Sequence, residues 1–358
     1  MKMYLYERHF NQVIILGAGA SKSDGAPLQR ELFSEFFKYR KKGLWSIPEE
    51  TDELIVKFFK DFWGINISSF NERDVKFPTF EECLGVLDLA RFQGDSFKGY
   101  TQDKIDKIRN ALIFLIAKIL DEKLRNETKY HKILVNTLKS RGILKETAFL
   151  SLNYDIIIDN VLTQSCPDFH LDYGIGFINF YRDDSNWKKP DSNKSILLLK
   201  LHGSLNWLLC PTCNHLELTP KEKGAIKAFY NLKKCEICNS LMKPVIIPPS
   251  FYKEISNPFI QQIFLKAYYV LRQVDKIFFC GYSFPDADLH IKYLLKKAEM
   301  FKGETPDIYV INSYPNKPES QKREEKTRYM RFFKDKEKIH YKNLSFEEFC
   351  EDHHDLFS

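Results

Sequence analysis

Short runs of apolar residues that stop abruptly at small or polar residues recur along this chain. Five such runs occupy residues 12–16, 147–152, 195–201, 274–280 and 308–311. A strand that is buried on both faces has a continuous apolar sequence, because helices cover both sides of a parallel sheet. The pattern therefore predicts an α/β protein built on a Rossmann-like parallel sheet.

The residues that follow these runs should meet at one edge of the sheet, because the carboxyl ends of parallel strands lie together. They are Gly17 to Ser21, Asn153 to Asp155, His202 to Ser204, Gly281 to Ser283, and Asn312 to Ser313. Among them, His202 has a side chain that takes up a proton near neutral pH. We expect a ligand crevice at this edge, with His202 as its candidate base.

The first strand runs directly into Gly17-Ala18-Gly19-Ala20-Ser21. Small residues at this point let the backbone approach a phosphate, with N–H groups directed at it. Lys22 stands where the third glycine of the dinucleotide-binding fingerprint belongs, and the motif is not a P-loop. Gly25-Ala26-Pro27 then opens a helix, since proline suits a first helical turn.

Residues 40–142 carry a helical pattern and no catalytic motif. Thr79 and Glu82 have the spacing of a capping box, and residues 103–124 form a long apolar-periodic segment. We expect a helical insertion here, packed on the sheet or on another subunit. The mixed charges of residues 317–338 are typical of a solvated helix, so residues 314–358 are expected to form a helical tail.

Four cysteines form two C-x-x-C pairs within a short polar stretch. They are Cys210, Cys213, Cys235 and Cys238. Two such pairs at this separation can arrange four thiolates tetrahedrally around one Zn²⁺ ion. We expect a closed, structural zinc module over residues 207–243, with His215 a bystander. Cys83, Cys166, Cys280 and Cys350 show no pairing pattern and are expected to be inert.

Composition sets limits on the remaining classes of function. The chain is 44% hydrophobic and 28% charged, as in a globular protein, and its net charge of +6 gives no reason to infer nucleic-acid binding. The longest apolar run, residues 111–120, is too short to span a bilayer. The first ten residues lack the apolar core of a signal peptide. We expect a cytoplasmic protein without a membrane partner.

Taken in order, these motifs resemble the sirtuin-like NAD-binding family over residues 12–313. The matching residues are 17–21 (family G-A-G-x-S), 25–30 (G-I-P-D-F-R), 151–155 (T-Q-N-I-D), 201–204 (the catalytic histidine motif), 281–283 (G-T-S) and Asn312 (the ribose-binding asparagine). The paired cysteines follow the histidine, as zinc modules do in sirtuins. The resemblance implies a single sirtuin-like domain, residues 1–358, that binds NAD as substrate.

The resemblance also implies roles for the residues at the sheet edge. His202 would be the base, Asn153 would position water or a ribose hydroxyl, and Asp155 would hold the nicotinamide carboxamide. The other expected NAD contacts are Gly17, Ala18, Gly19, Ser21, Arg30, Ser204, Gly281, Ser283 and Asn312. The small loop would bind the pyrophosphate with the charge of Arg30, and Ser283 and Asn312 would hold the adenosine half.

Departures from the deacylase pattern favour one branch of the family. Leu28 and Gln29 replace an Asp-Phe pair, Leu152 replaces a glutamine, and the insertion is larger. These features resemble prokaryotic sirtuin-like proteins that hydrolyse NAD during antiphage abortive infection. That branch implies an oligomer and a separately encoded partner such as a HerA-like ATPase. A protein lysine deacylase and a non-catalytic NAD or ADP-ribose sensor remain alternatives.

Overall fold

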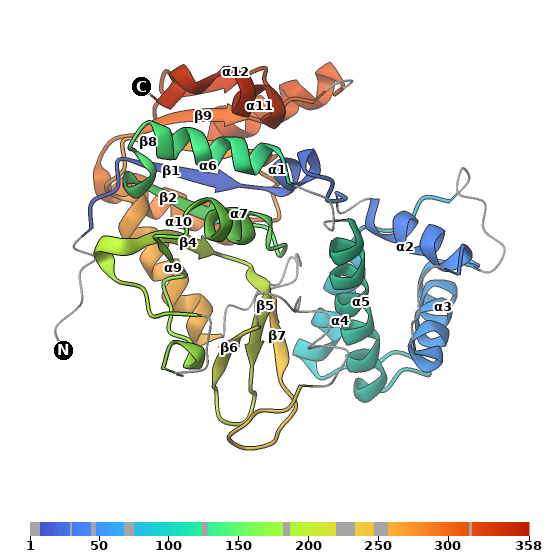
Figure 1. The fold of residues 1–358 in the computed structure, drawn as a ribbon. Helices are drawn as coiled ribbons and strands as arrows, with labels where there is room; N and C mark the ends of the chain where they lie inside the picture. Colours follow the sequence, from blue (N-terminus) through green and yellow to red (C-terminus); the bar gives the residue numbers. More distant parts are fainter. Residues whose placement is uncertain are drawn as a thin grey trace. The chain divides into compact units, whose positions relative to one another are not determined.

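The computed structural model divides the chain into two compact units, which are coloured along the sequence in Figure 1. An α/β unit comprises residues 1–26, 126–247 and 255–358, and a helical unit comprises residues 27–125 and 248–254. The residues described are 8–28, 31–43, 48–67, 75–123, 128–181, 187–219, 233–246, 257–314 and 317–357.

The α/β unit is built on a seven-stranded sheet in the order β10-β9-β8-β1-β2-β4-β3 (Figure 1). The strands are β1 (Gln12–Leu16), β2 (Thr147–Ser151), β3 (His170–Asp172), β4 (Ser195–Lys200), β8 (Lys276–Cys280), β9 (Asp307–Ile311) and β10 (Ile339–Lys342). Every pairing in this sheet is parallel. The predicted Rossmann-like fold class is therefore confirmed.

The chain adds strands first on one side of the central strand β1 and later on its other side. The chain passes from β1 to β2 on one side, and later returns to place β8 on the other side of β1. Leu16 is in register with both Ser151 and Cys280, so these three strands end level with one another. A point where the strand order reverses is where open α/β sheets bind ligands.

Two edge strands were absent from the sequence prediction. β3 lies in a stretch that reads as a loop, and β10 lies in the expected helical tail. Each is short and only partly buried, so neither has the continuous apolar run of a central strand. The expected tail is thus a helix, an edge strand and a further helix.

Helices of the α/β unit cover the sheet (Figure 1). They are α1 (Ala18–Ser23), α6 (Tyr130–Ser140), α7 (Ile157–Ser165), α9 (Pro258–Leu271), α10 (Leu289–Lys302), α11 (Glu319–Phe332) and α12 (Phe346–Asp352). Helix α6 packs against α7 and α12, and α9 packs against α10. The expected insertion, residues 40–142, included α6, which the structure places in the α/β unit.

The helical unit has an aromatic core of its own. Its helices are α2 (Leu32–Lys41), α3 (Glu49–Trp63), α4 (Phe80–Gln93) and α5 (Gln102–Lys123). Phe59 makes edge-to-face contacts with Phe33 and Phe37, at ring-centroid distances of 4.8 and 5.2 Å. The predicted capping box of Thr79 and Glu82 begins α4. Neither unit contains, among its described residues, a helix long and apolar enough to cross a bilayer.

A small antiparallel sheet, in the order β6-β5-β7, follows β4 almost at once. Its strands are β5 (Gly203–Leu209), β6 (Leu216–Leu218) and β7 (Lys243–Ile246). Gly203 has a positive φ of 80°, and a Cβ atom there would lie 2.1 Å from the carbonyl oxygen of Val245. Glycine is therefore required where the chain passes from the parallel sheet to the antiparallel one.

Candidate active site

His202 lies at the junction of the two sheets, between the end of β4 and the start of β5. Its Nδ1 atom is 2.9 Å from the carbonyl oxygen of Leu152. Because a carbonyl oxygen only accepts, Nδ1 carries the proton, and the lone pair of the neutral ring is on Nε2. The side chain is 5% exposed. This tautomer is the one that can accept a proton at Nε2.

His290, in the first turn of α10, was not predicted as a site residue. Its Nε2 atom is 2.8 Å from Nε2 of His202. Asp288, two residues earlier, accepts a hydrogen bond of 2.8 Å from the hydroxyl of Tyr282. The sequence signal was an aspartate and a histidine shortly after the β8 strand, at the edge where the other polar residues gather.

Asn153 and Asp155, which follow β2, form one buried network with Ser21 of the glycine-containing loop. The Asn153 amide donates to Ser21 Oγ at 2.8 Å and to the Gly17 carbonyl oxygen at 2.9 Å. Ser21 Oγ in turn donates to Asp155 Oδ2 at 2.7 Å. Asp155 Oδ1 accepts from the backbone N–H of Ile157, at the start of α7. The structure thus brings together three of the predicted site residues.

The loop after β1 packs directly against the loop after β8. Gly17 N–H donates to the Cys280 carbonyl at 2.9 Å, and Gly19 N–H donates to the Gly281 carbonyl at 2.8 Å. A Cβ atom at Gly17 would lie 2.6 Å from the Gly281 carbonyl oxygen. Both N–H groups are therefore bonded within the protein, and binding of a phosphate by this loop remains a prediction. Ala18, between them, is exposed.

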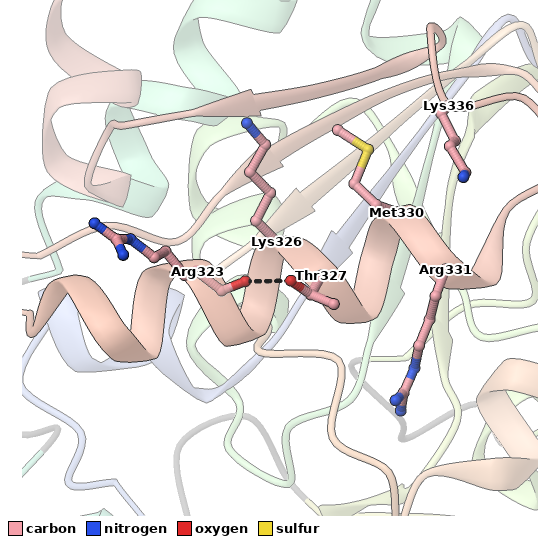
Figure 2. A pocket seen from close by; sticks show the side chains of 6 residues that line it. All are labelled: Arg323, Lys326, Thr327, Met330, Arg331 and Lys336. Atoms are coloured by element: carbon pink, nitrogen blue, oxygen red, sulfur yellow. Dashed lines mark hydrogen bonds between the residues drawn. The ribbon is translucent and has the colours of Figure 1, made fainter.

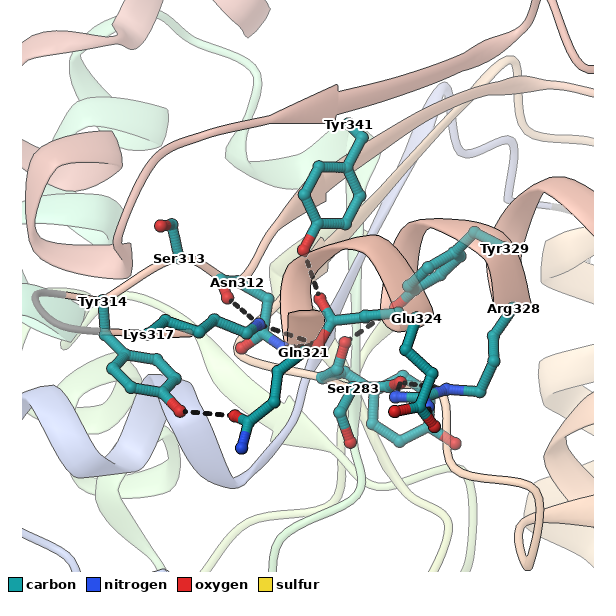
Figure 3. Close-up of polar contacts among 12 residues, drawn as sticks. Ser283, Asn312, Ser313, Tyr314, Lys317, Gln321, Glu324, Arg328, Tyr329 and Tyr341 are labelled. Carbon is teal, nitrogen blue, oxygen red and sulfur yellow. Dashed lines mark hydrogen bonds and ion pairs between the residues drawn. The ribbon is translucent and has the colours of Figure 1, made fainter. Parts of the chain in front are cut away.

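Asn312 and Ser283 lie near a polar cluster on α11 (Figure 3). The Asn312 amide donates to Glu325 Oε2 at 2.9 Å, and buried Lys317 binds the same carboxylate oxygen at 2.8 Å. Tyr341 donates to the other oxygen of Glu325. Ser283 is exposed, and its carbonyl oxygen accepts from the side chain of Arg328. Contact of Asn312 and Ser283 with adenosine remains a prediction.

Of the two other predicted contacts, Ser204 is among the described residues and Arg30 is not. Ser204 is wholly buried, and its hydroxyl donates to Asn206 Oδ1 at 2.6 Å. The neighbouring Leu205 N–H donates to the Tyr154 carbonyl at 3.0 Å, which ties this segment to the loop after β2. Arg30 lies outside the described residues.

A buried ion pair beneath the site was not anticipated from the sequence. Lys200, the last residue of β4, is 3.0 Å from Asp159 Oδ2, and both side chains are almost completely buried. Tyr173 donates to the other oxygen of Asp159 at 2.7 Å, and burial together with this carboxylate raises the pKa of Tyr173. Lys200 also donates to the backbone carbonyl of Asp155. The lysine therefore holds the loop after β2 in place.

The four paired cysteines converge, as the spacing predicted. Sγ of Cys238 lies 3.3 Å from Sγ of Cys210 and 3.6 Å from that of Cys213, and Cys213 lies 3.5 Å from Cys235. All four sulfur atoms lie within 4.8 Å of one another. Tetrahedral Zn²⁺ with Zn–S bonds of about 2.3 Å would separate them by about 3.8 Å. The donor set and its spacing therefore fit one zinc ion.

Neighbouring groups favour the thiolate form of Cys238. Hydrogen bonds from the Ser240 hydroxyl and backbone N–H lower the pKa of Cys238 to about 6. His215, expected to be a bystander, has its Nδ1 atom 3.1 Å from Sγ of Cys213. Asn214 and Asn239 follow the two C-x-x-C pairs and both adopt positive φ, so the two cysteine turns have matching backbones.

Residues 147–336, just over half of the chain, match the model of the SIR2-like domain. The chain belongs to the SIR2-like domain family. The matched part of this SIR2-like chain contains His202, Asn153, His290 and the four cysteines.

Solved sirtuin structures are similar to this SIR2-like chain at low identity. Sir2 bound to an acetylated peptide has a TM-score of 0.44 and 13% identity, covering 97% of this chain and 92% of that one. A complex of Sir2 with a p53 peptide and NAD⁺ has a TM-score of 0.41 and 14% identity, covering 98% and 96%. No match was found among curated proteins.

One pocket of the SIR2-like chain is lined mainly by basic residues of α11 (Figure 2). It has a volume of about 480 Å³ and is lined by Arg323, Lys326, Thr327, Met330, Arg331 and Lys336. Thr327 donates to the Arg323 carbonyl within α11, and Arg331 pairs with Asp286 at 2.7 Å. None of the residues predicted to bind NAD lines this pocket.

Proposed function

We propose that this SIR2-like protein is an NAD hydrolase that cleaves the nicotinamide–ribose bond to give nicotinamide and ADP-ribose. The observation that carries the proposal is the tautomer of His202. Its Nδ1–H donates to Leu152, so Nε2 is the proton-accepting atom, at the sheet edge where the Asn153 network lies. Hydrolysis of the nicotinamide–ribose bond requires a base, and His202 Nε2 would supply it at this edge of the sheet.

The reaction needs a group that activates water or a ribose hydroxyl. Departure of nicotinamide leaves positive charge on the ribose, as in an oxocarbenium ion, and an attacking hydroxyl must lose a proton. His202 Nε2 would take that proton once the His290 ring, which now lies 2.8 Å away, moves and lets water or ribose reach Nε2. Both hydrogens of the Asn153 amide are donated within the protein, so its carbonyl oxygen is the atom left to accept from water or ribose.

The remaining NAD contacts are proposed around the same edge. Each carboxylate oxygen of Asp155 accepts one hydrogen bond, from Ser21 or from Ile157. The remaining lone pairs of these oxygens would accept from the carboxamide of nicotinamide. The loop of Gly17, Ala18, Gly19 and Ser21, with Arg30, would face the pyrophosphate. Ser283 and Asn312 would hold the adenosine half, and Ser204 and Gly281 are further proposed contacts of NAD. The strand-order reversal beside β1 supports this placement.

A structural zinc ion is part of the proposal. Cys210, Cys213, Cys235 and Cys238 would hold it as thiolates, with all four positions supplied by the protein. Such a closed site supplies folding energy rather than chemistry. The ion would stabilise the small sheet that begins at Gly203, next to the base.

The biological setting is proposed from the motif departures. Leu28 and Leu152 replace residues of the deacylase pattern, and the helical unit is large, as in antiphage NAD hydrolases. We place the protein in abortive infection, as a homo-oligomer that depletes cellular NAD. A HerA-like ATPase is the kind of partner that would relay the signal of an invader.

Incubation with NAD, with and without an acylated lysine peptide, tests the activity. Nicotinamide and ADP-ribose are separated by liquid chromatography, with and without the candidate partner. The wild type should release nicotinamide without the peptide. His202→Ala and Asn153→Ala should each lower the rate by about 10²–10⁴-fold, the usual contribution of general acid–base catalysis. His9→Ala, an exposed histidine, is the matched control and should keep full activity.

Each other outcome selects a different function. Turnover that strictly requires the acylated peptide would identify a deacylase. NAD binding without turnover, with partner and trigger present, would identify a sensor. Full activity of His202→Ala would exclude His202 as the base.

A further inference from the structure

A second group of metal-binding side chains lies at the proposed base itself. One ring nitrogen each of His202 and His290 and a carboxylate oxygen of Asp288 all lie within 4.8 Å of one another. His202 comes from the β4–β5 junction, and the other two come from the start of α10. These atoms are therefore held by regular elements of the α/β unit.

Two of these three side chains are oriented by a neighbouring group. His202 donates its Nδ1–H to the Leu152 carbonyl, which directs the Nε2 lone pair toward His290. The Tyr282 hydroxyl donates to Asp288 Oδ2 and fixes the carboxylate. Histidines that bind metals almost always donate their other ring N–H to a carbonyl or carboxylate in this way. His202 and Asp288 are also buried, at 5% and 8% exposure.

We propose that His202, Asp288 and His290 form a binding site for one Zn²⁺ ion, separate from the four cysteines. Two imidazoles and one carboxylate suit zinc or cobalt, and three protein ligands leave one position open. The two Nε2 atoms are 2.8 Å apart with one hydrogen between them. Zn–N bonds of about 2.0–2.1 Å in a tetrahedral site need about 3.3 Å, so the rings separate by about 0.5 Å. His290 then carries its hydrogen on Nδ1.

The ion has a direct consequence for the reaction. It occupies the Nε2 lone pair of His202, which is the lone pair that accepts a proton from water or ribose. Zn²⁺ at this site therefore inhibits nicotinamide release. This consequence depends on the proposed NAD hydrolysis, whereas binding of the ion does not.

Metal content tests the site without any assay of activity. The full chain is equilibrated with micromolar Zn²⁺, separated from free ion and analysed by mass spectrometry of the metal. The wild type should hold about two Zn per chain, and His290→Ala about one. Tyr282→Phe keeps every ligand and should weaken the second site by about 10–100-fold. His340→Ala, on the edge strand β10, should retain both ions.

Cobalt distinguishes the two sites within one protein. Co²⁺ bound to thiolates absorbs through sulfur-to-metal charge transfer, and Co²⁺ bound by nitrogen and oxygen does not. The wild type should show both kinds of spectrum, and His290→Ala only the thiolate kind. A wild type that holds one Zn per chain, or a His290→Ala variant that still holds two, would overturn the site.

Activity in the presence of zinc tests the consequence. Nicotinamide release by the wild type should fall by at least about tenfold when the second ion binds, and His290→Ala should resist the same concentration. Binding of the second ion without inhibition would overturn the inhibitory role. A wild type that releases no nicotinamide at all refutes the proposed hydrolysis, while the metal content still decides the site.

Discussion

At the scale of single residues, the tightest packing at the carboxyl edge of the parallel sheet is at Gly281. Its φ is +65°, and a Cβ atom there would lie 1.9 Å from the backbone nitrogen of Ala20. Backbone faces backbone at this contact, so neither side can turn away as a flexible side chain would. The loop that we propose for the pyrophosphate therefore depends on a glycine that lies 261 residues after Ala20 in the chain.

Gly281→Ala should lower the free energy of unfolding by about 2–5 kcal/mol. About 1–2 kcal/mol comes from the left-handed backbone and about 1–3 from overpacking. Gly303→Ala is the matched control, since Gly303 has a φ of +83° and no described atom lies near its Cβ position. It should cost only the backbone contribution. Denaturant unfolding measures both, and equal costs would show that the contact at Gly281 is loose.

Asp24 is a second residue that we expect to contribute strongly to stability, because its carboxylate binds the start of α6. Its carboxylate accepts from the backbone N–H groups of Lys129, Tyr130 and His131, at the start of α6, and from the His131 ring. Burial acts to raise the pKa of Asp24, but these hydrogen bonds outweigh it and hold the pKa below the ordinary value of 3.8. The folded state therefore favours the ionised carboxylate.

Asp24→Ala should destabilise the protein by about 1–3 kcal/mol at pH 7, because buried donors lose their acceptor. A lowered pKa gives stability that is present above the unfolded pKa and lost as the pH falls through the folded one. The difference between wild type and variant should therefore shrink below about pH 3.8. Urea unfolding at pH 7 and pH 3 measures it. A difference that is constant with pH would contradict this account.

At the scale of elements, the small sheet and its cysteines form the part that we expect to depend on metal. β6 is three residues long and β7 four, and short strands of this kind bury little apolar surface. The thiolates are brought together by two turns of the same form. Metal binding is therefore expected to supply the folding energy of this element.

As purified, without added Zn²⁺, the protein should contain about one Zn per chain in the cysteine cluster, and Cys213→Ser should be insoluble or unfolded. The reason is that removal of one thiolate leaves an open and weak site. Cys166→Ala, a buried cysteine outside the cluster, should retain zinc and remain soluble. Elemental analysis and circular dichroism provide the measurements. A folded, active and zinc-free Cys213→Ser protein would refute the structural role.

At the scale of the whole molecule, most large apolar side chains of the helical unit are buried among the described residues. Residues 111–120 of α5 are mostly buried, and Phe92 is the exposed large hydrophobic side chain of this unit within the described residues. Exposed apolar residues are more numerous on α10 of the α/β unit. They are Leu289, Tyr293, Met300 and Phe301. Exposed apolar groups of this kind are typical of interaction surfaces.

We expect the chain to form a homo-oligomer at micromolar concentration. The physical reason is the apolar surface that a monomer would leave in contact with water. Light scattering over a range of concentrations measures the mass directly. A protein that stays strictly monomeric throughout that range would contradict the prediction.

The sequence by itself determined the features that depend on local pattern. Continuous apolar runs predicted the five central strands, because burial on both faces favours apolar residues at most positions. The spacing of Cys210 to Cys238 predicted the thiolate cluster, and Thr79 with Glu82 predicted a helix start. Each of these depends on residues close together in the chain. The edge strands β3 and β10 lack such a pattern, because each is only partly buried.

Only the tertiary structure decided which side chains meet at the carboxyl edge. His202 and His290 are 88 residues apart, and no local period relates them. Lys200 with Asp159, and Gly19 with Gly281, are likewise paired by the order of the strands. The physical reason is that the apolar pattern of a strand shows only which of its own residues are buried. The direction of a loop side chain, by contrast, depends on the neighbouring strand against which the loop packs, and that neighbour can be far away in the sequence.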